Sequence, residues 1–187
     1  MTVVKSSGHE KSEDIEARLT SQDPEVLETC LSFVKELFTT EQERGDRVSS
    51  RATSIIGFAA IVAALSADLL NFISSMRTTK YCFSVGLALI YICMLITIFG
   101  SIWLGFGGRR RDTAAVPHVD GIFSFQGLKV IDVKRKWLSD LISAYKVTTD
   151  DVNQRVTRVH SAQNWLAVAV FLLLLLAGLG VIAILIV

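Results

Sequence analysis

The sequence predicts an all-α membrane protein with three transmembrane helices, of which the first and third carry long cytoplasmic helical extensions. Apolar residues make up 51% of the 187-residue chain and are concentrated in three runs. Residues 81–108 and 161–187 contain no charged side chain, and residues 52–76 contain only Asp68. Because about 20 mostly apolar residues cross a bilayer, each run is long enough to span one.

The positions of lysine and arginine predict the orientation of these spans. Seven of the 19 cationic residues precede residue 52, two lie in the short loop at 77–80, and ten lie between residues 109 and 158. Cytoplasmic segments carry an excess of lysine and arginine, so we expect the N-terminus and the long loop inside and the C-terminus outside. The expected segments are a flexible polar tail (1–22), a cytoplasmic helix (23–51), the first span (52–76), the second span (81–107), a cytoplasmic loop with two helical segments (108–160) and the third span (161–187).

The first extension is expected to continue into the membrane as one helix. Asp23 can cap it, and Pro24 suits the first helical position. No proline occurs between residues 25 and 116, so any bend is expected only near Gly45. Small or apolar residues recur at alternating spacings of four and three, with Glu41 as the clear exception. This seam consists of Leu27, Leu31, Val34, Phe38, Glu41, Gly45, Val48, Ala52 and Ile55.

The long loop is expected to contain an amphipathic helix and then a second helical segment. Val133, Trp137, Leu141 and Tyr145 recur every four residues and share one face. Thr148, with an acidic residue three positions later, resembles a capping box and predicts a new helix start. A second seam then runs into the third span through Val152, Val156, Val159, Gln163, Leu166 and Val170. The two extended helices point the same way, so we expect them to pack against each other or against further copies.

Small residues in the first span predict a contact between membrane helices. Ala59, Ala63 and Ala67 form a ridge of the kind that lets helix backbones approach closely. Asp68 either reaches the outer interface, where a charge is tolerated, or takes part in a pore or oligomer contact. Three spans without a long polar face cannot enclose a channel, so a membrane-permeabilising function would require homo-oligomers.

Motifs of known enzyme classes are absent from the sequence. It has no phosphate-binding Gly-Lys-Ser/Thr loop, His-Glu-x-x-His, Cys-x-x-Cys or Gly-x-Ser-x-Gly. The histidines are isolated in sequence, and the three cysteines lie in the second span or on a cytoplasmic helix. We therefore expect no enzymatic activity, catalytic residue, bound metal, cofactor, disulfide framework or nucleic-acid partner.

Arginines at the membrane edge form the candidate ligand site. Arg44, Arg47 and Arg51 make one stripe, and two arginines make a shorter stripe before the third span. They either contact lipid headgroups and nearby carboxylates, or they face each other around a bound phosphate group. In the second case a tryptophan could stack on a base. The candidate residues are Arg44, Arg47, Arg51, Arg155, Arg158, Lys134, Arg135, Lys136 and Trp137. The segment GFGGRRR (105–111) is either a stop-transfer cluster or a further phosphate cradle.

This pattern resembles the small transmembrane effectors of bacterial anti-phage signalling, most closely those of the Pycsar system and next the SLATT-type effectors. The resemblance is carried by EQERGDRVSSRATSIIGFAAIVAAL, a close pair of spans, a helical cytoplasmic insert and DDVNQRVTRVHSAQNWLAVAVFLLLLLAGL. It implies a bacterial inner-membrane protein of abortive infection that senses a cyclic pyrimidine nucleotide (cUMP or cCMP) made by a nucleotide cyclase. The effector would then disrupt the membrane as a homo-oligomer in contact with lipid.

Two other functions remain open at the level of sequence. One is a non-enzymatic membrane scaffold with a coiled-coil stalk, which would need the two seams but not the membrane-edge arginines. The other is a holin-like lysis protein, which would not need about a hundred cytoplasmic residues.

Overall fold

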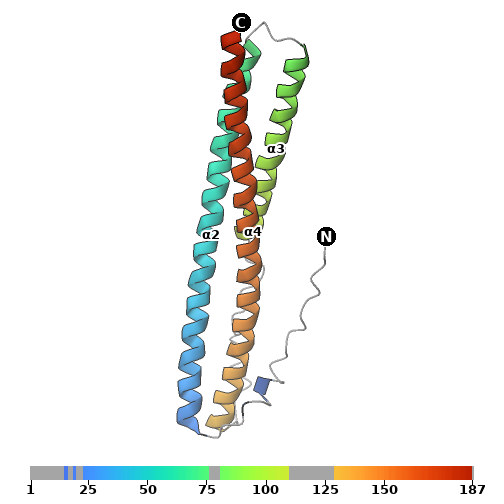
Figure 1. The fold of residues 1–187 in the computed structure, drawn as a ribbon. Helices are drawn as coiled ribbons and strands as arrows, with labels where there is room; N and C mark the ends of the chain where they lie inside the picture. Colours follow the sequence, from blue (N-terminus) through green and yellow to red (C-terminus); the bar gives the residue numbers. More distant parts are fainter. Residues whose placement is uncertain (1–14, 17–18, 20–22, 76–80, 110–128, 187) are drawn as a thin grey trace. The chain divides into compact units, whose positions relative to one another are not determined.

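The computed structural model describes residues 15–16, 19, 23–75, 81–109 and 129–186. Three long helices account for nearly all of them: α2 (Pro24–Ser75), α3 (Tyr81–Arg109) and α4 (Val130–Ile186) (Figure 1). The described residues include no strand. Each long helix has a stretch that is long and apolar enough to cross a membrane. The prediction of an all-α fold is therefore confirmed for the described residues, and three helices could each span a membrane, as expected for a multi-pass membrane protein.

Helix α2 confirms the predicted continuity between the first extension and the first span. It runs for 52 residues and passes through Gly45 without interruption. At its start, the Glu25 backbone N–H donates to Asp23 Oδ1 at 2.9 Å, as expected for a capping aspartate. The Leu27 N–H donates to the Asp23 carbonyl oxygen at 3.2 Å. The side chain and the backbone of Asp23 thus each accept a hydrogen bond from the first turn.

Helix α4 differs from the predicted pair of segments. The sequence predicted a new start at Thr148, whereas α4 is one helix of 57 residues. No glycine or proline occurs between residues 130 and 177, and a single threonine disfavours a helix by less than about 1 kcal/mol. A capping signal without a break before it is too weak to end a helix, so the capping-box prediction was wrong.

The chain divides into two compact units. Unit 1 comprises Met1–Asp46 and Arg111–Asn153, and unit 2 comprises Arg47–Arg110 and Gln154–Val187. Helices α2 and α4 contribute residues to both units, whereas the described part of α3 belongs to unit 2.

In unit 1, α2 and α4 run parallel. Lys134 Nζ lies 2.7 Å from Glu28 Oε2, and Arg44 Nη2 lies 3.2 Å from Asn153 Oδ1. The α4 partners lie 106 and 109 residues further along the chain, so both helices advance in the same direction. Apolar side chains of both helices are also buried in this unit. The buried apolar residues of unit 1 on these helices are Leu27, Leu138, Leu141, Ala144 and Val152.

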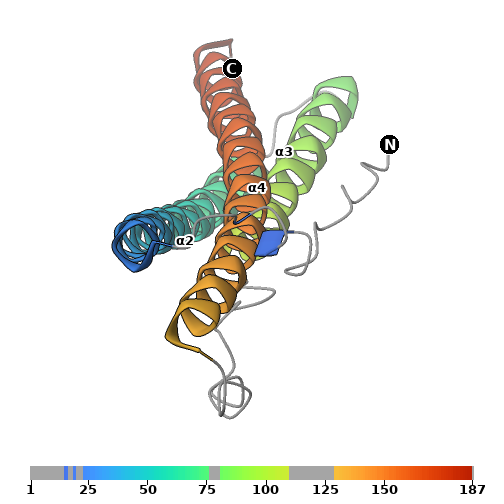
Figure 2. The ribbon, with the colours of Figure 1, turned by 90° about the horizontal axis from the view of Figure 1, so that it is seen from below.

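In unit 2, α3 runs antiparallel to α4. Ser101 Oγ donates to the Ala162 carbonyl oxygen at 2.9 Å, and Arg158 Nη1 donates to the Gly107 carbonyl oxygen at 3.2 Å. Moving forward along α3 therefore means moving backward along α4. In Figures 1 and 2 the start of α3 and the C-terminal end of α4 lie further apart than the other ends of the two helices in this unit. The hydrogen bonds between α3 and α4 lie at the end where α3 finishes.

Small residues make up much of the interface in unit 2. Six of them have no solvent exposure: Ala52, Ala59, Ser66, Ser101, Ala162 and Ala169. Lipid tails are as apolar as leucine, so close van der Waals packing at small residues holds membrane helices together. Ala59 belongs to a core cluster with Met94 and Ala169, and Ala63 packs against the same cluster. Ala59 of the predicted ridge is therefore buried inside the chain's own helix packing and cannot contact a second copy. The sequence alone does not distinguish small residues that pack within one chain from those that pack between copies. Ala67 and Asp68 are exposed.

The structure agrees with four of the six predicted seam positions of α4 and differs at two. Val152 and Val159 are buried and Leu166 is partly buried, in agreement with the sequence pattern. Val156 is also partly buried and packs against the cluster that contains Val159 and Ala162, with the buried Arg155 beside it. Ala162 and Ala169 are buried in place of the expected Gln163 and Val170, which are exposed. The pattern favoured Val170 because it is apolar, but lipid solvates an exposed valine well, so hydrophobicity stops marking the interior face.

We predict that Gly108→Ala destabilises unit 2 by about 1–3 kcal/mol, the usual cost of overpacking. A Cβ at Gly108 would lie 2.5 Å from Val159 Cγ2, and β-branched valine has little freedom to move aside. The matched control is Gly86→Ala on the same helix, where a Cβ would meet no atom within 4 Å. Both variants replace glycine by alanine within the same helix, so a loss of stability confined to Gly108→Ala in unfolding titrations in mixed micelles reports the clash. Equal stability of the two variants would contradict this packing.

Candidate functional site

The nine residues of the predicted ligand site are divided between the two units. Unit 1 holds Arg44, Lys134, Arg135, Lys136 and Trp137, and unit 2 holds Arg47, Arg51, Arg155 and Arg158. In unit 1, three of the cations pair with carboxylates. In unit 2, Arg158 bonds a backbone carbonyl, Arg155 is buried, and Arg47 and Arg51 are exposed.

In unit 1, Arg44 links the two helices. Its Nη1 lies 2.9 Å from Glu41 Oε1 one turn earlier on α2, and its Nη2 donates to Asn153 Oδ1 of α4 at 3.2 Å. Glu41 is only 8% exposed. Glu41, the one charged residue in the predicted seam of α2, is thus paired with Arg44, and Arg44 also donates a hydrogen bond to α4. The position of Arg44 depends on how α2 and α4 pack in this unit.

The remaining candidate cations of unit 1, Lys134, Arg135 and Lys136, lie on the first two turns of α4. Lys134 forms the 2.7 Å ion pair with Glu28, while Arg135 Nη1 lies 3.8 Å from Asp132 Oδ1 of its own helix. The hydrogen bond and the charge of Lys134 lower the pKa of the Glu28 carboxyl group. Trp137 is 46% exposed, so a large part of its ring is open to contact. A base-stacking role for Trp137 stays a prediction.

In unit 2, two of the predicted arginines have structural positions. Arg155 is 4% exposed and occupies the seam of α4. Arg158 donates to the Gly107 carbonyl oxygen, one of the last carbonyls of α3, which lack partners within the helix. Gly107 keeps the arginine close, because a Cβ there would lie 3.2 Å from Arg158 Cδ. The glycines at 105, 107 and 108 let the end of α3 approach α2 and α4 closely. From the sequence, these glycines indicated only a possible phosphate cradle.

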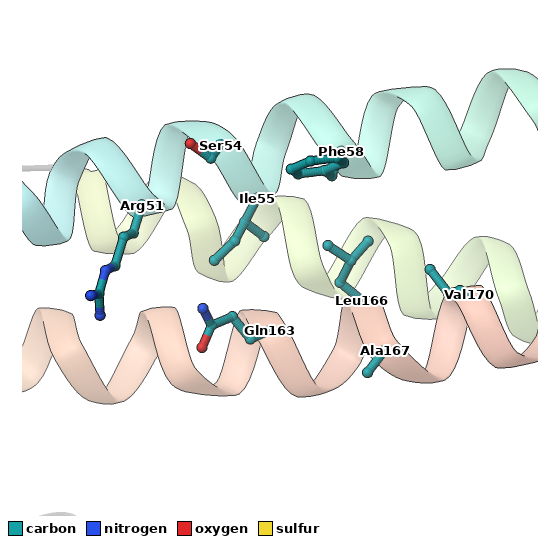
Figure 3. Close-up of a pocket in the computed structure, with 8 residues that line it drawn as sticks. All are labelled: Arg51, Ser54, Ile55, Phe58, Gln163, Leu166, Ala167 and Val170. Carbon is teal, nitrogen blue, oxygen red and sulfur yellow. The ribbon is translucent and has the colours of Figure 1, made fainter.

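Arg47 and Arg51 are exposed, and Arg51 stands at one end of an open groove between α2 and α4 (Figure 3). The groove has a volume of about 590 Å³ and lies within unit 2. Figure 3 shows Arg51 and Gln163 reaching toward each other from opposite helices, with α3 behind them. The residues that line the groove are Arg51, Ser54, Ile55, Phe58, Gln163, Leu166, Ala167 and Val170.

Sequence reasoning missed this groove because it assigned Gln163 to the seam. The structure places Ala162 in the seam and leaves Gln163 exposed at the groove. A shift of one residue turns a helical side chain by about 100°, since an α-helix has 3.6 residues per turn. A glutamine near the start of an uncharged, mostly apolar run was the available signal.

The described residues contain no group of three or more His, Cys, Asp or Glu side chains that could hold a metal ion. Of the segment GFGGRRR, residues 105–109 end α3, and Arg110 and Arg111 lie outside the described residues. The polar tail at 1–22 and the first part of the long loop lie mostly outside them as well. No family model, curated protein or solved structure matches this chain.

We predict that the Glu28–Lys134 contact persists at neutral pH and is lost in acid. A carboxyl group whose pKa is lowered by folding contributes stability above its unfolded pKa, and this contribution disappears as the pH falls through the folded pKa. The measurement is an NMR titration of the Glu28 carboxyl carbon in the full-length protein. Lys134→Gln should raise this pKa, whereas Lys35→Gln, on the exposed surface of α2, should leave it unchanged. The same pKa in all three proteins would contradict the contact.

Proposed function

We propose that this protein is a membrane effector of antiviral, abortive-infection defence. It senses a cyclic pyrimidine nucleotide on its cytoplasmic face and disrupts inner-membrane integrity as a homo-oligomer. The observation that carries the proposal is the continuity of α2 and α4, each of which joins charged residues of unit 1 to an apolar stretch of unit 2. A contact made on the charged part of such a helix acts on the same continuous helix whose apolar part would enter the lipid.

The excess of lysine and arginine in residues 1–51 and 109–158 supports a cytoplasmic position for unit 1. A nucleotide produced in the cytoplasm would therefore meet this unit. No described residue of unit 1 lies in the long uncharged runs.

Arg44 is the residue best suited to receive the signal. Its planar guanidinium group matches a phosphate group as well as a carboxylate, so a cyclic phosphate can compete with Glu41 for it. Because Arg44 also donates to Asn153, this exchange would change the link between α2 and α4 within unit 1. Trp137 offers an exposed ring for the pyrimidine base.

The energies involved are adequate for a switch. Charge-assisted hydrogen bonds contribute about 1.5–3 kcal/mol each, and two of them match the few kcal/mol that separate alternative conformations. The nucleotide must bind one arrangement of the helices more tightly than the other, since equal affinity shifts nothing. Replacing the Arg44–Glu41 pair in only one arrangement would supply that difference.

Membrane disruption is the predicted output. The full-length protein in liposomes loaded with a self-quenched dye should release the dye after cUMP or cCMP is added to the cytoplasmic face, and cAMP serves as the comparison ligand. Arg44→Gln should reduce the response at least tenfold, because it removes the cation that pairs with the phosphate. Lys35→Gln, an equal loss of charge on the same helix and unit, should leave the response unchanged.

Insertion and yield of each variant are checked by flotation before the assay. Absence of release with any cyclic nucleotide would count against the proposed function. Equal responses of the wild type and both variants would place recognition elsewhere than Arg44.

A further inference from the structure

We infer that the groove between α2 and α4 in unit 2 binds one anionic phospholipid. Its phosphate group would lie at Arg51 and Gln163, and an acyl chain would lie along the apolar wall. This inference is independent of nucleotide sensing. It rests on three properties of the groove: its charge, its apolar length and its place on the bundle.

The charged end of the groove is an exposed cation, Arg51. Among the residues that the structure describes, no carboxylate lies within ion-pairing distance of Arg51, and Gln163 makes no hydrogen bond to another side chain or to the backbone. The two side chains reach toward each other from opposite helices (Figure 3). A guanidinium group and a primary amide together offer several N–H donors to one phosphate and bring one positive charge.

The other end of the groove is apolar. Beyond Arg51 and Gln163 its lining residues are Ile55, Phe58, Leu166, Ala167 and Val170, with the small Ser54 near the polar end. The Ser54 hydroxyl already donates to the Ser50 carbonyl oxygen at 3.2 Å. From Arg51 to Phe58 the groove follows α2 for roughly 10 Å, at about 1.5 Å per residue. A ligand that fits it has an anionic head attached to a hydrocarbon chain.

The position of the groove favours a membrane lipid over a soluble amphiphile. On α2, Arg51 is the last charged residue before a run of 16 uncharged residues that ends at Ala67. Helix α3 covers the other side of the α2–α4 pair, where a Cβ at Gly105 or Gly108 would meet Ile56 or Val159. No third helix of the described residues covers the groove side in Figure 3, where α3 lies behind the α2–α4 pair. The phosphate layer of a bilayer lies where the charged part of such a helix gives way to its apolar part.

The test uses the full-length protein in a zwitterionic detergent, with retained lipids counted by native mass spectrometry. Phosphatidylglycerol and phosphatidylcholine with the same acyl chains are the probes. One phosphatidylglycerol should be retained per chain with at least tenfold preference over phosphatidylcholine. Arg51→Gln should weaken phosphatidylglycerol retention about tenfold, and Gln163→Leu should weaken it several-fold. Circular dichroism checks that both variants remain helical.

Arg47→Gln is the matched control, because Arg47 is exposed one turn from Arg51 and does not line the groove. It should retain phosphatidylglycerol as the wild type does. Equal losses for Arg47→Gln and Arg51→Gln would show unspecific attraction and overturn the inference. Displacement of the lipid by inorganic phosphate would overturn it in favour of a small-anion site. A change in the monomer–dimer ratio of Arg51→Gln without a change in lipid retention would overturn it in favour of a second copy of the chain.

Discussion

The close approach of helix backbones at small residues is the constraint on which unit 2 depends. Burial of apolar side chains gives no net preference for one helix face in lipid, so packing and hydrogen bonding must select the interface. The fully buried alanines at positions 52 and 162 and the glycine at 108 bring three helices together. The hydrogen bond from Ser101 to the Ala162 carbonyl oxygen requires that short distance. The orientation of α3 and the location of the groove both follow from which faces carry these small residues.

The same close packing explains where the polar side chains of unit 2 lie. Once α3 approaches at its glycines, its final carbonyls need donors, and Arg158 supplies one to Gly107. Small residues in the seam also turn their larger neighbours outward. Gln163 follows Ala162 and therefore lies at the groove, and Arg51 precedes Ala52 and lies at the same groove. The amphipathic character of the groove is thus a by-product of the seam, created by the residues adjacent to its small positions.

The parts of the fold that were predictable from sequence are those in which hydrophobicity still distinguishes two faces. In α2 the seam was predicted from Leu27 to Ile55, and every one of its positions is at least partly shielded from solvent, because charged residues mark the opposite face as far as Arg51. In the third span hydrophobicity no longer separates the faces, so Gln163 and Val170 were assigned to the seam where Ala162 and Ala169 are buried. Helix α4 was divided at Thr148 for a related reason, since a local capping pattern was weighed without the packing that overrides it. The candidate arginines were identified as a set, but their individual partners depend on backbone carbonyls and on neighbouring helices, which a sequence does not display.

Charged residues inside the seam set the properties of unit 1. A buried carboxylate such as Glu41 lowers stability unless it is paired, and a buried ion pair adds little net stability compared with apolar packing. Arg44 makes the pair tolerable and adds the bond to Asn153, so the polar contact specifies how α2 and α4 align and contributes little to their attraction. A phosphate group would offer Arg44 the same charge and geometry as the carboxylate, but the exchange would leave Glu41 without its partner, so it would favour an arrangement of α2 and α4 in which Glu41 reaches water. Buried apolar residues on the same two helices, such as Leu27, Leu138 and Val152, would keep them paired during such an exchange. Under the proposed function, unit 1 would therefore combine apolar pairing and the Lys134–Glu28 contact with a polar link at Arg44 that a ligand can replace.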